Sequence, residues 1–295
     1  MPAITTPFKP DLGVDVEFMQ RHCRWLVDNG CTGIVALGSL GEGQTLRLGE
    51  KRDVLRACVE AVGERVPVVA GVSALSTADA VEIAQMARDE ECSGLMVLPP
   101  YVYVGDWREM KSHVGVVLNA TDLPVMLYNN PVAYKVDFVP AQVKELANEY
   151  PTLRAIKESS ADVRRVAALQ ERIGMERLAI LVGVDDLIVE AAAMGAVGWI
   201  AGLVNAFPKE SVELFRLAQQ ESASALALYQ WFLPLLRMDT VPKFVQLIKL
   251  VQEEVGMGSS RVRPPRLELT EEEKAEVRAI VKQALRNRSV AVAAR

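Results

Sequence analysis

The chain has few of the side chains that bind transition metals. Its 295 residues include four cysteines and two histidines. No C-x-x-C pair occurs, so the ligand spacing of a zinc site cannot be assembled, and we expect no metal. Free thiols in a reducing cytoplasm are the favoured interpretation of the cysteines, which are Cys23, Cys31, Cys58 and Cys92.

Long apolar runs and strong positive charge are also missing. No apolar stretch reaches the about 18 residues of a membrane span, and no basic-then-apolar leader stands at the N-terminus. The formal net charge is −5, and the densest positive segment, "RVRPPR" at 261–266, is short. We therefore expect a cytoplasmic protein that binds neither membranes nor nucleic acid.

What the sequence does contain is an alternation of β-rich runs and amphipathic helical segments. Eight such runs predict parallel strands with helical crossovers, hence an α/β fold, a (β/α)8 TIM barrel over residues 1–205. The rival doubly wound sheet is disfavoured because no G-x-G-x-x-G follows the first run. Residues 206–295 read as helices and predict a C-terminal helical extension. The eight runs are 3–8, 32–38, 66–72, 94–100, 124–130, 153–159, 178–184 and 198–203.

The segment "LRAIKESS" places Lys157 inside one of these apolar runs. A lysine can extend its stem to the strand end, or pair with an acid such as Glu158. Alternatively, burial disfavours the ammonium and so favours the free amine, which can attack a carbonyl or an imine. Both interpretations are open from this segment alone.

Two further segments fall at the carboxyl ends of predicted strands, where barrel enzymes carry their active sites. "YNNP" ends one strand at Tyr128, whose ring could simply fill the barrel mouth or whose phenol could shuttle a proton. "GSLGEG" at 38–43 is a Gly-rich turn that could hold a phosphate or a carboxylate on backbone N–H groups. It lacks the G-K-[ST] of a P-loop.

In this order the motifs resemble those of the dihydrodipicolinate synthase and N-acetylneuraminate lyase family of Schiff-base-forming barrels. The likeness runs from "TTPF" through "GSLGEG", "YNNP", "IKES" and "VGVDD" into the helical tail. It implies that Lys157 forms an imine with the substrate and that Tyr128 relays protons. Glu42 would brace the turn. No metal or organic cofactor is implied, because the lysine imine is the electron sink.

The same resemblance implies a substrate-binding set around the lysine. Ser39 and Leu40 would hold the substrate carboxylate on their backbone N–H groups, with the Ser39 hydroxyl beside it. Gly183 and Ile200 would line the pocket, and Tyr101 would lie near the site of a neighbouring subunit. The family's usual assembly implies a homotetramer.

Two departures from the synthase pattern guide the choice of substrate. The synthases carry an arginine two residues after the proline of Y-N-x-P, where this chain has Ala133. They also carry a second threonine in the turn, where this chain has Leu40. Losing a cation and a hydroxyl should weaken the binding of a carboxylate-bearing aldehyde. We therefore expect dihydrodipicolinate synthesis to be a lesser possibility.

The combined motifs look closest to the Δ1-pyrroline-4-hydroxy-2-carboxylate deaminases of hydroxyproline degradation. This predicts a lyase or hydrolase that opens a cyclic imino acid on Lys157 and releases 2-oxoglutarate semialdehyde and ammonia. The alternative is a 2-keto-3-deoxy sugar acid dehydratase or aldolase that acts on a 2-oxo acid through the same imine. A barrel that only binds 2-oxo acids is disfavoured, because Lys157 and Tyr128 are both present.

Overall fold

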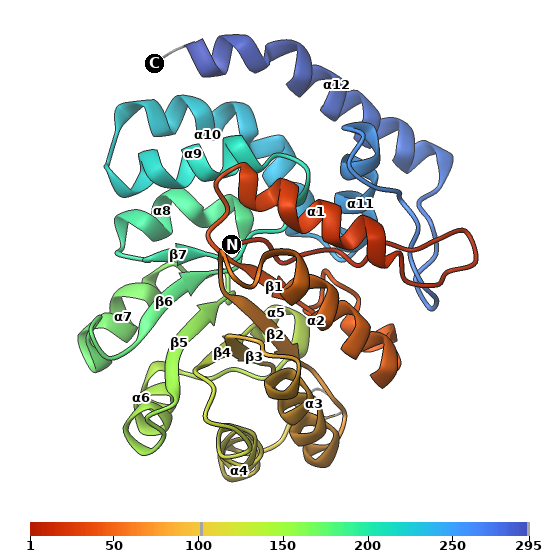
Figure 1. The fold of residues 1–295 in the computed structure, drawn as a ribbon. Helices are drawn as coiled ribbons and strands as arrows, with labels where there is room; N and C mark the ends of the chain where they lie inside the picture. The colour runs from red at the N-terminus through yellow and green to blue at the C-terminus, as the bar shows by residue number, and fades with distance from the viewer. Residues whose placement is uncertain (101–102, 294–295) are drawn as a thin grey trace.

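The computed structural model describes residues 1–100 and 103–293, with side chains up to residue 288. Seven parallel strands form one curled sheet, and each pairs with the next along the chain (Figure 1). The predicted barrel and its helical extension are confirmed. The strands are β1 Ile34–Ala36, β2 Val68–Val72, β3 Gly94–Val97, β4 Val125–Asn129, β5 Leu153–Glu158, β6 Ala179–Val182 and β7 Gly198–Trp199.

The N-terminal segment closes the barrel between the first and last strands. Pro2 pairs with Ala201 beyond β7, and Ala3 pairs with Val35 of β1, both in parallel. The predicted strand at 3–8 is therefore wrong as a regular strand, although the segment occupies the eighth position. Prolines at 2 and 7 lack the N–H that a continuous ladder requires, so only isolated bridges form.

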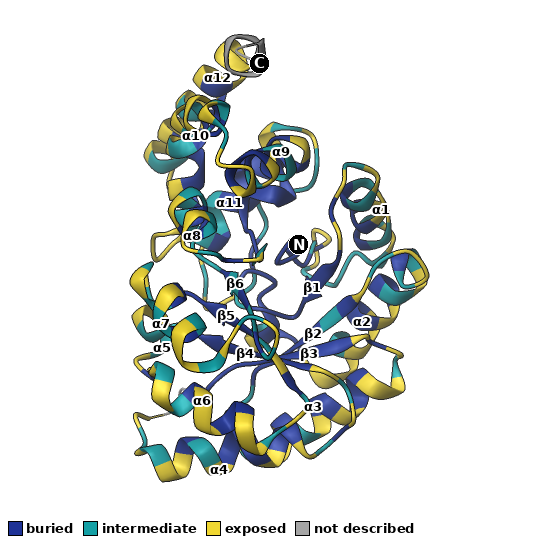
Figure 2. Cartoon of the chain, turned by 90° about the vertical axis from the view of Figure 1, so that its left-hand side faces the viewer, coloured by how far each residue is buried: buried dark blue, intermediate teal, exposed yellow. Residues whose placement is uncertain are grey.

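Helices surround the sheet and bury their apolar sides against it, as the colouring of Figure 2 shows. Several begin at side-chain caps, for example Asp15, Ser76 and Asp106. The helices around the barrel are α1 Val16–Asp28, α2 Leu48–Val62, α3 Thr77–Asp89, α4 Trp107–Leu118, α5 Pro131–Tyr134, α6 Pro140–Glu149, α7 Arg164–Ile173, α8 Ile188–Ala193 and α9 Pro208–Gln219. Short 3-10 turns lie at η1 Gly43–Thr45, η2 Asp185–Leu187, η3 Leu203–Asn205 and η4 Arg237–Asp239.

The C-terminal helices pack together on one side of the barrel (Figure 1). They are α10 Ala223–Leu236, α11 Phe244–Glu254 and α12 Glu271–Ala293. Trp231 of α10 donates from its indole N–H to the carbonyl of Ala284 in α12 at 3.0 Å. Helix α9 directly follows β7 in the alternation, so the division at residue 205/206 stays a prediction.

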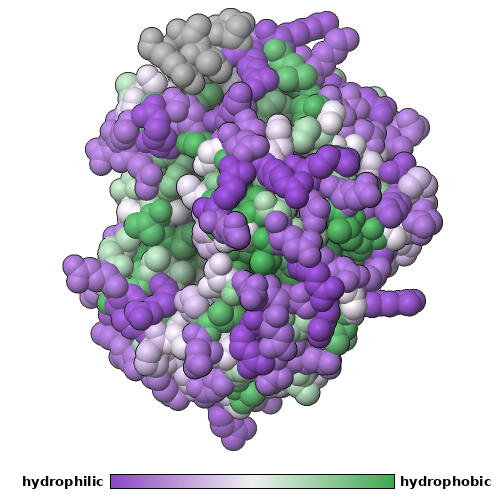
Figure 3. All heavy atoms as spheres, in the orientation of Figure 1, coloured by the Kyte–Doolittle hydropathy of each residue, from purple (hydrophilic) through white to green (hydrophobic). Residues whose placement is uncertain are grey.

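The surface seen in Figure 3 is largely hydrophilic, with apolar side chains gathered in separate patches between the charged ones. Across the described helices, none is both long enough and apolar enough to cross a membrane.

Candidate active site

Lys157 and Tyr128 occupy matched positions on the neighbouring strands β5 and β4. Both side chains are buried, and Lys157 is 6% exposed. The Lys157 Nζ lies 4.2 Å from the centroid of the Tyr128 ring. An amine and a phenol thus meet at the carboxyl end of the sheet, where a barrel presents its reactive groups.

A second tyrosine adds another hydroxyl group to this site. Tyr134, at the end of α5, packs its ring edge-on against Tyr128 at 5.9 Å between centroids. Its hydroxyl contacts the Ser39 hydroxyl. The Tyr128 hydroxyl accepts from the Asn130 side-chain amide at 3.0 Å. Sequence analysis missed Tyr134, because α5 spans only four residues and is too short to show a periodic pattern.

The Gly-rich turn at 38–43 lies beside these hydroxyl groups. Leu40 is buried, whereas Ser39 is partly open. Within the described part of the chain, the backbone N–H groups of Ser39 and Leu40 donate to no acceptor. Two N–H donors without an acceptor are suited to a carboxylate. Close packing explains the glycines, since a Cβ on Gly43 would lie 2.1 Å from the Leu37 carbonyl oxygen.

Gly183 leaves the space that the Lys157 side chain occupies. A Cβ built on Gly183 would lie 2.2 Å from the Lys157 Cε and 2.3 Å from the Ser159 Oγ. Both atoms lie close to the same Cβ position, so the Ser159 hydroxyl is a near neighbour of the Lys157 side chain. This hydroxyl is buried and has no partner among the described residues. Its place beside the lysine stem is a feature that the sequence did not reveal.

Ile200 follows β7 and is buried, and its N–H donates to the Val182 carbonyl at 2.8 Å. The other predicted pocket residue, Tyr101, lies outside the described residues. Its predicted place near a neighbouring subunit stays a prediction. Among the residues that the structure describes, no group of three or more His, Cys, Asp or Glu side chains could hold a metal ion.

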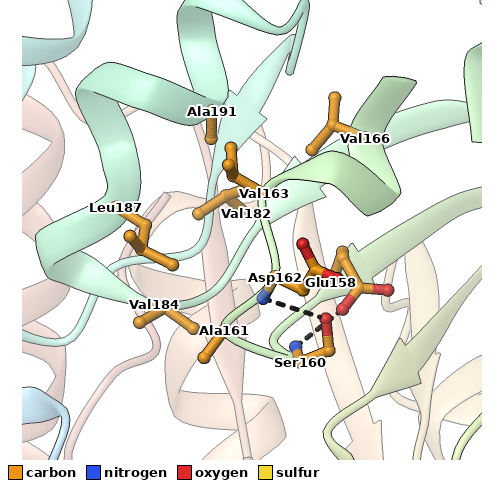
Figure 4. A pocket seen from close by; sticks show the side chains of 10 residues that line it. All are labelled: Glu158, Ser160, Ala161, Asp162, Val163, Val166, Val182, Val184, Leu187 and Ala191. Carbon is orange, nitrogen blue, oxygen red and sulfur yellow. Dashed lines mark hydrogen bonds between the residues drawn. The ribbon is translucent and has the colours of Figure 1, made fainter. Parts of the chain in front are cut away.

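Glu158 does not serve as the partner of Lys157. Its carboxylate accepts from the Asn129 side-chain amide at 3.1 Å and from the Ser160 N–H at 2.6 Å. Figure 4 shows it beside Ser160 at a small pocket between the ends of β5 and β6 and the helices α7 and α8. Successive strand residues point to opposite faces, which separates Glu158 from Lys157. Burial raises the pKa of Glu158.

Two buried acids, Asp185 and Asp239, interact electrostatically with Lys157. Burial raises the pKa of Asp185 to about 6, and Lys157 acts in the opposite direction. Its carboxylate accepts from the Trp199 indole at 3.0 Å and from the Leu203 N–H at 2.8 Å. Desolvation also raises the pKa of Asp239, which lies against Gly202. Asp185 thus anchors the turn after β7.

Comparison with known proteins places these features in a family context. The sequence model of the dihydrodipicolinate synthetase family matches residues 1–284. A 4-hydroxy-tetrahydrodipicolinate synthase of Methanocaldococcus jannaschii is 31% identical over 274 residues, covering 92% of this chain and 93% of that protein. One of Methanococcus maripaludis is 30% identical over 277 residues, covering 94% of each.

Solved structures give the same family context. The 4-hydroxy-tetrahydrodipicolinate synthase of Methylacidiphilum fumariolicum superposes with a TM-score of 0.94 at 27% identity, covering 98% of this chain and 96% of that one. A prophage protein of E. coli K12 that belongs to the dihydrodipicolinic acid synthase family, solved with pyruvate, gives 0.90 at 27% identity, covering 96% and 97%.

The predicted deaminase of hydroxyproline degradation is wrong. The curated relatives that cover 92% or more of this chain are named 4-hydroxy-tetrahydrodipicolinate synthase, the activity that the sequence analysis ranked lower. That ranking rested partly on the hydroxyl lost at Leu40. In the folded chain Ser39 instead contacts Tyr134, so a set of neighbouring hydroxyl groups is present despite that loss.

Proposed function

Because the chain belongs to the dihydrodipicolinate synthetase family, a family of Schiff-base lyases, we propose that it condenses pyruvate with an amino-aldehyde through an imine on Lys157. This is the reaction for which its curated relatives are named. The observation that carries the proposal is the buried Lys157 amine beside the Tyr128 ring, which Tyr134 connects to Ser39 of the Gly-rich turn.

The acceptor follows from the chemistry of the product named in those relatives. Removing the carbons of pyruvate from the 4-hydroxy-tetrahydrodipicolinate skeleton leaves L-aspartate semialdehyde. Its amine closes the ring on the carbonyl carbon that pyruvate contributes. The substrates are then one 2-oxo acid and one amino-aldehyde, and both carry a carboxylate.

The steps use groups that this chain places together. The Lys157 amine attacks C2 of pyruvate, and loss of water leaves a protonated imine that acidifies C3. Tyr128 accepts and returns protons, with Tyr134 and Ser39 next to it. The resulting enamine adds to the aldehyde carbon. Attack by the substrate's own amine on C2 closes the ring and releases Lys157. The N–H groups of Ser39 and Leu40 hold the pyruvate carboxylate.

The acceptor's carboxylate must find a partner other than residue 133, which is alanine. Asn130, Tyr134 and Lys135 are the polar side chains near this position. Lys135 is exposed, and its Nζ donates to the Val132 carbonyl at 3.0 Å. We therefore expect weaker selection for a carboxylate on the aldehyde than a buried arginine would give.

A homotetramer is part of the proposal. Large apolar side chains are exposed on the loops after β2 and β3, among them Leu75 at 64%, Tyr103 at 56% and Val104 at 67%. Exposed apolar side chains that lie close together favour burial against another subunit. Light scattering coupled to size exclusion measures the mass, and a monomeric mass would contradict the tetramer.

Borohydride trapping tests the imine. Wild type and Lys157→Met are incubated with pyruvate and then reduced with borohydride. The mass of each intact protein is measured by mass spectrometry. We expect one pyruvate adduct on the wild type and none on the variant. Absence of an adduct on folded wild-type protein would refute the imine.

A second assay tests the acceptor by following consumption of L-aspartate semialdehyde with pyruvate present. Aldehydes that lack the carboxylate serve as comparison, and omission of pyruvate is the control. Turnover of L-aspartate semialdehyde is expected. An adduct with pyruvate but turnover only with the other aldehydes would leave the imine standing and overturn the proposed acceptor.

A further inference from the structure

The turn that carries Ser39 and Leu40 is closed by a residue in an unusual conformation. Glu42 has φ 54° and ψ 30°, the left-handed region that few residues other than glycine adopt. Its N–H donates to the Ser39 carbonyl at 3.1 Å, and the Gly43 N–H donates to the Gly38 carbonyl at 3.3 Å. The direction of the N–H groups at 39 and 40 therefore depends on how Glu42 is held.

The Glu42 side chain is fully buried and is held by charges from far along the chain. Its Oε1 accepts from the Lys249 Nζ at 2.5 Å, and its Oε2 accepts from the backbone N–H of Arg263 at 3.0 Å. The Arg266 guanidinium lies 3.9 Å from the same Oε2. All three partners belong to α11 or the segment after it. Three residues of the C-terminal extension thus contact one acid of the turn, Glu42.

Lys249 is itself enclosed, with 1% of its surface exposed. Its Nζ also donates to the Arg261 carbonyl at 2.7 Å and lies 4.2 Å from the centre of the Phe8 ring. Burial lowers the pKa of Lys249 to about 8, and Glu42 opposes that effect. Arg263 packs on Phe8 as well, at 4.6 Å, and binds both Glu50 oxygens at 2.8 Å.

A buried ion pair is costly to desolvate, so stability alone is a weak reason to have one. Its geometry, however, is strongly fixed, because both charges need their hydrogen-bond partners. Two arginines of the "RVRPPR" segment take part in the same region, because Arg266 lies against Glu42 and Arg263 pairs with Glu50.

We propose that Glu42 and Lys249 are positioning residues, through which the C-terminal extension holds the 38–43 turn in the shape that binds the substrate carboxylate. The proposal rests on the proposed function, because it assigns the turn to the carboxylate of a 2-oxo acid. The barrel sheet closes through the N-terminal bridges without these helices. The extension is then part of the active site's framework.

The test combines a binding readout with a readout of the turn itself. Lys249→Met keeps the packing on Phe8 and removes the charge. The double variant Glu42→Gln with Lys249→Met removes both charges, which protects against misfolding from one unpaired buried charge. The pyruvate concentration for half-maximal borohydride trapping and hydrogen exchange at the Glu42, Gly43 and Thr45 amides are measured in each.

For both variants we expect at least a tenfold rise in the half-maximal pyruvate concentration and faster exchange at the three amides. The trapping rate at saturating pyruvate should change little, because Lys157 and Tyr128 are untouched. Leu228→Ala, in the buried face of α10, is the matched control for lost stability. Lys111→Met, which removes a surface cation paired with Glu145 and Glu149, is the control for lost charge. Both should leave the two readouts unchanged.

The outcomes separate this inference from the proposed function. If wild type traps pyruvate and the folded double variant keeps both its half-maximal concentration and its exchange rates, the positioning role is overturned. If wild type traps no pyruvate, the imine chemistry fails. Exchange at the turn then still decides whether Lys249 holds Glu42, because it requires no catalysis.

Discussion

The Ser39 and Tyr134 hydroxyl groups are in contact, although 95 residues separate them in the chain. The Tyr134 ring in turn packs edge-on against Tyr128, whose own ring lies against the Lys157 amine. The Gly-rich turn, α5 and the strands β4 and β5 thus contribute to one continuous group of side chains. This arrangement defines the residues that the following predictions address.

Removing either tyrosine hydroxyl should slow proton transfer without preventing imine formation. We expect Tyr128→Phe to lower kcat by about 10²–10⁴-fold, since a positioned acid–base group contributes that much. Tyr134→Phe should lower kcat by less, because Tyr134 lies one step further from the amine. Steady-state kinetics and borohydride trapping measure the two effects separately. Tyr150→Phe, at the end of α6, is the control. A Tyr134→Phe enzyme with wild-type kcat would remove Tyr134 from the relay.

Replacing the lysine should abolish the reaction while preserving the fold. We expect Lys157→Met to lower kcat/KM by about 10³-fold or more, because no other amine stands at this position. The melting temperature should stay the same or rise, since the substitution replaces a buried polar group with an apolar side chain. Calorimetry and turnover assays on the same preparation compare the two. Residual turnover close to wild type would assign the imine to another residue.

A methyl group at position 183 should displace the Lys157 stem. The Gly183→Ala side chain would lie 2.2 Å from the Lys157 Cε, so the amine must shift. Misplacement of a reacting group by about 1 Å can cost about 10²-fold, and we expect a loss of that order in kcat/KM. Gly49→Ala is the matched control, because a Cβ there meets nothing within 4 Å. It should keep full activity. Equal activity in both variants would contradict the packing argument.

Acid should destabilise the protein through His22. This side chain is fully buried, and its Nε2 lies 3.0 Å from the Asn205 carbonyl. Burial lowers the pKa of His22 from 6.5 to about 4. In the unfolded chain, His22 therefore binds a proton below pH 6.5. In the folded chain it does so only below about pH 4. Stability is lost as the pH falls across this window, by up to about 3 kcal/mol.

Urea unfolding between pH 4 and pH 7 measures this loss. Asp185, whose pKa is raised to about 6, contributes with the opposite sign between about pH 4 and 6. The comparison of wild type with His22→Gln isolates the histidine, because Asp185 is common to both. The variant should lack the His22 part of the pH dependence. Identical pH slopes in the two proteins would contradict the buried, neutral His22.

The sequence by itself determined the barrel and its helical extension, and it placed Lys157 and Tyr128 near the ends of two strands. Strand and helix periodicity are local properties of the sequence, and seven of the eight predicted strands correspond to β1–β7. Tyr128 and Lys157 lie opposite each other near the ends of β4 and β5. The first run failed as a strand because its prolines interrupt the ladder. The predicted substrate is wrong because the identities of Leu40 and Ala133 do not show which hydroxyl groups the fold brings together from other segments.

Only the tertiary structure decided what surrounds the lysine. Tyr134 reaches Ser39, Gly183 makes room for Lys157, and Lys249 pairs with Glu42 across 207 residues. Such contacts join segments whose separation carries no periodic signal. They arise because closing the barrel brings the ends of its strands together and because the C-terminal helices fold back onto the turn. Distances between remote segments are set by packing, and packing is a property of the folded chain.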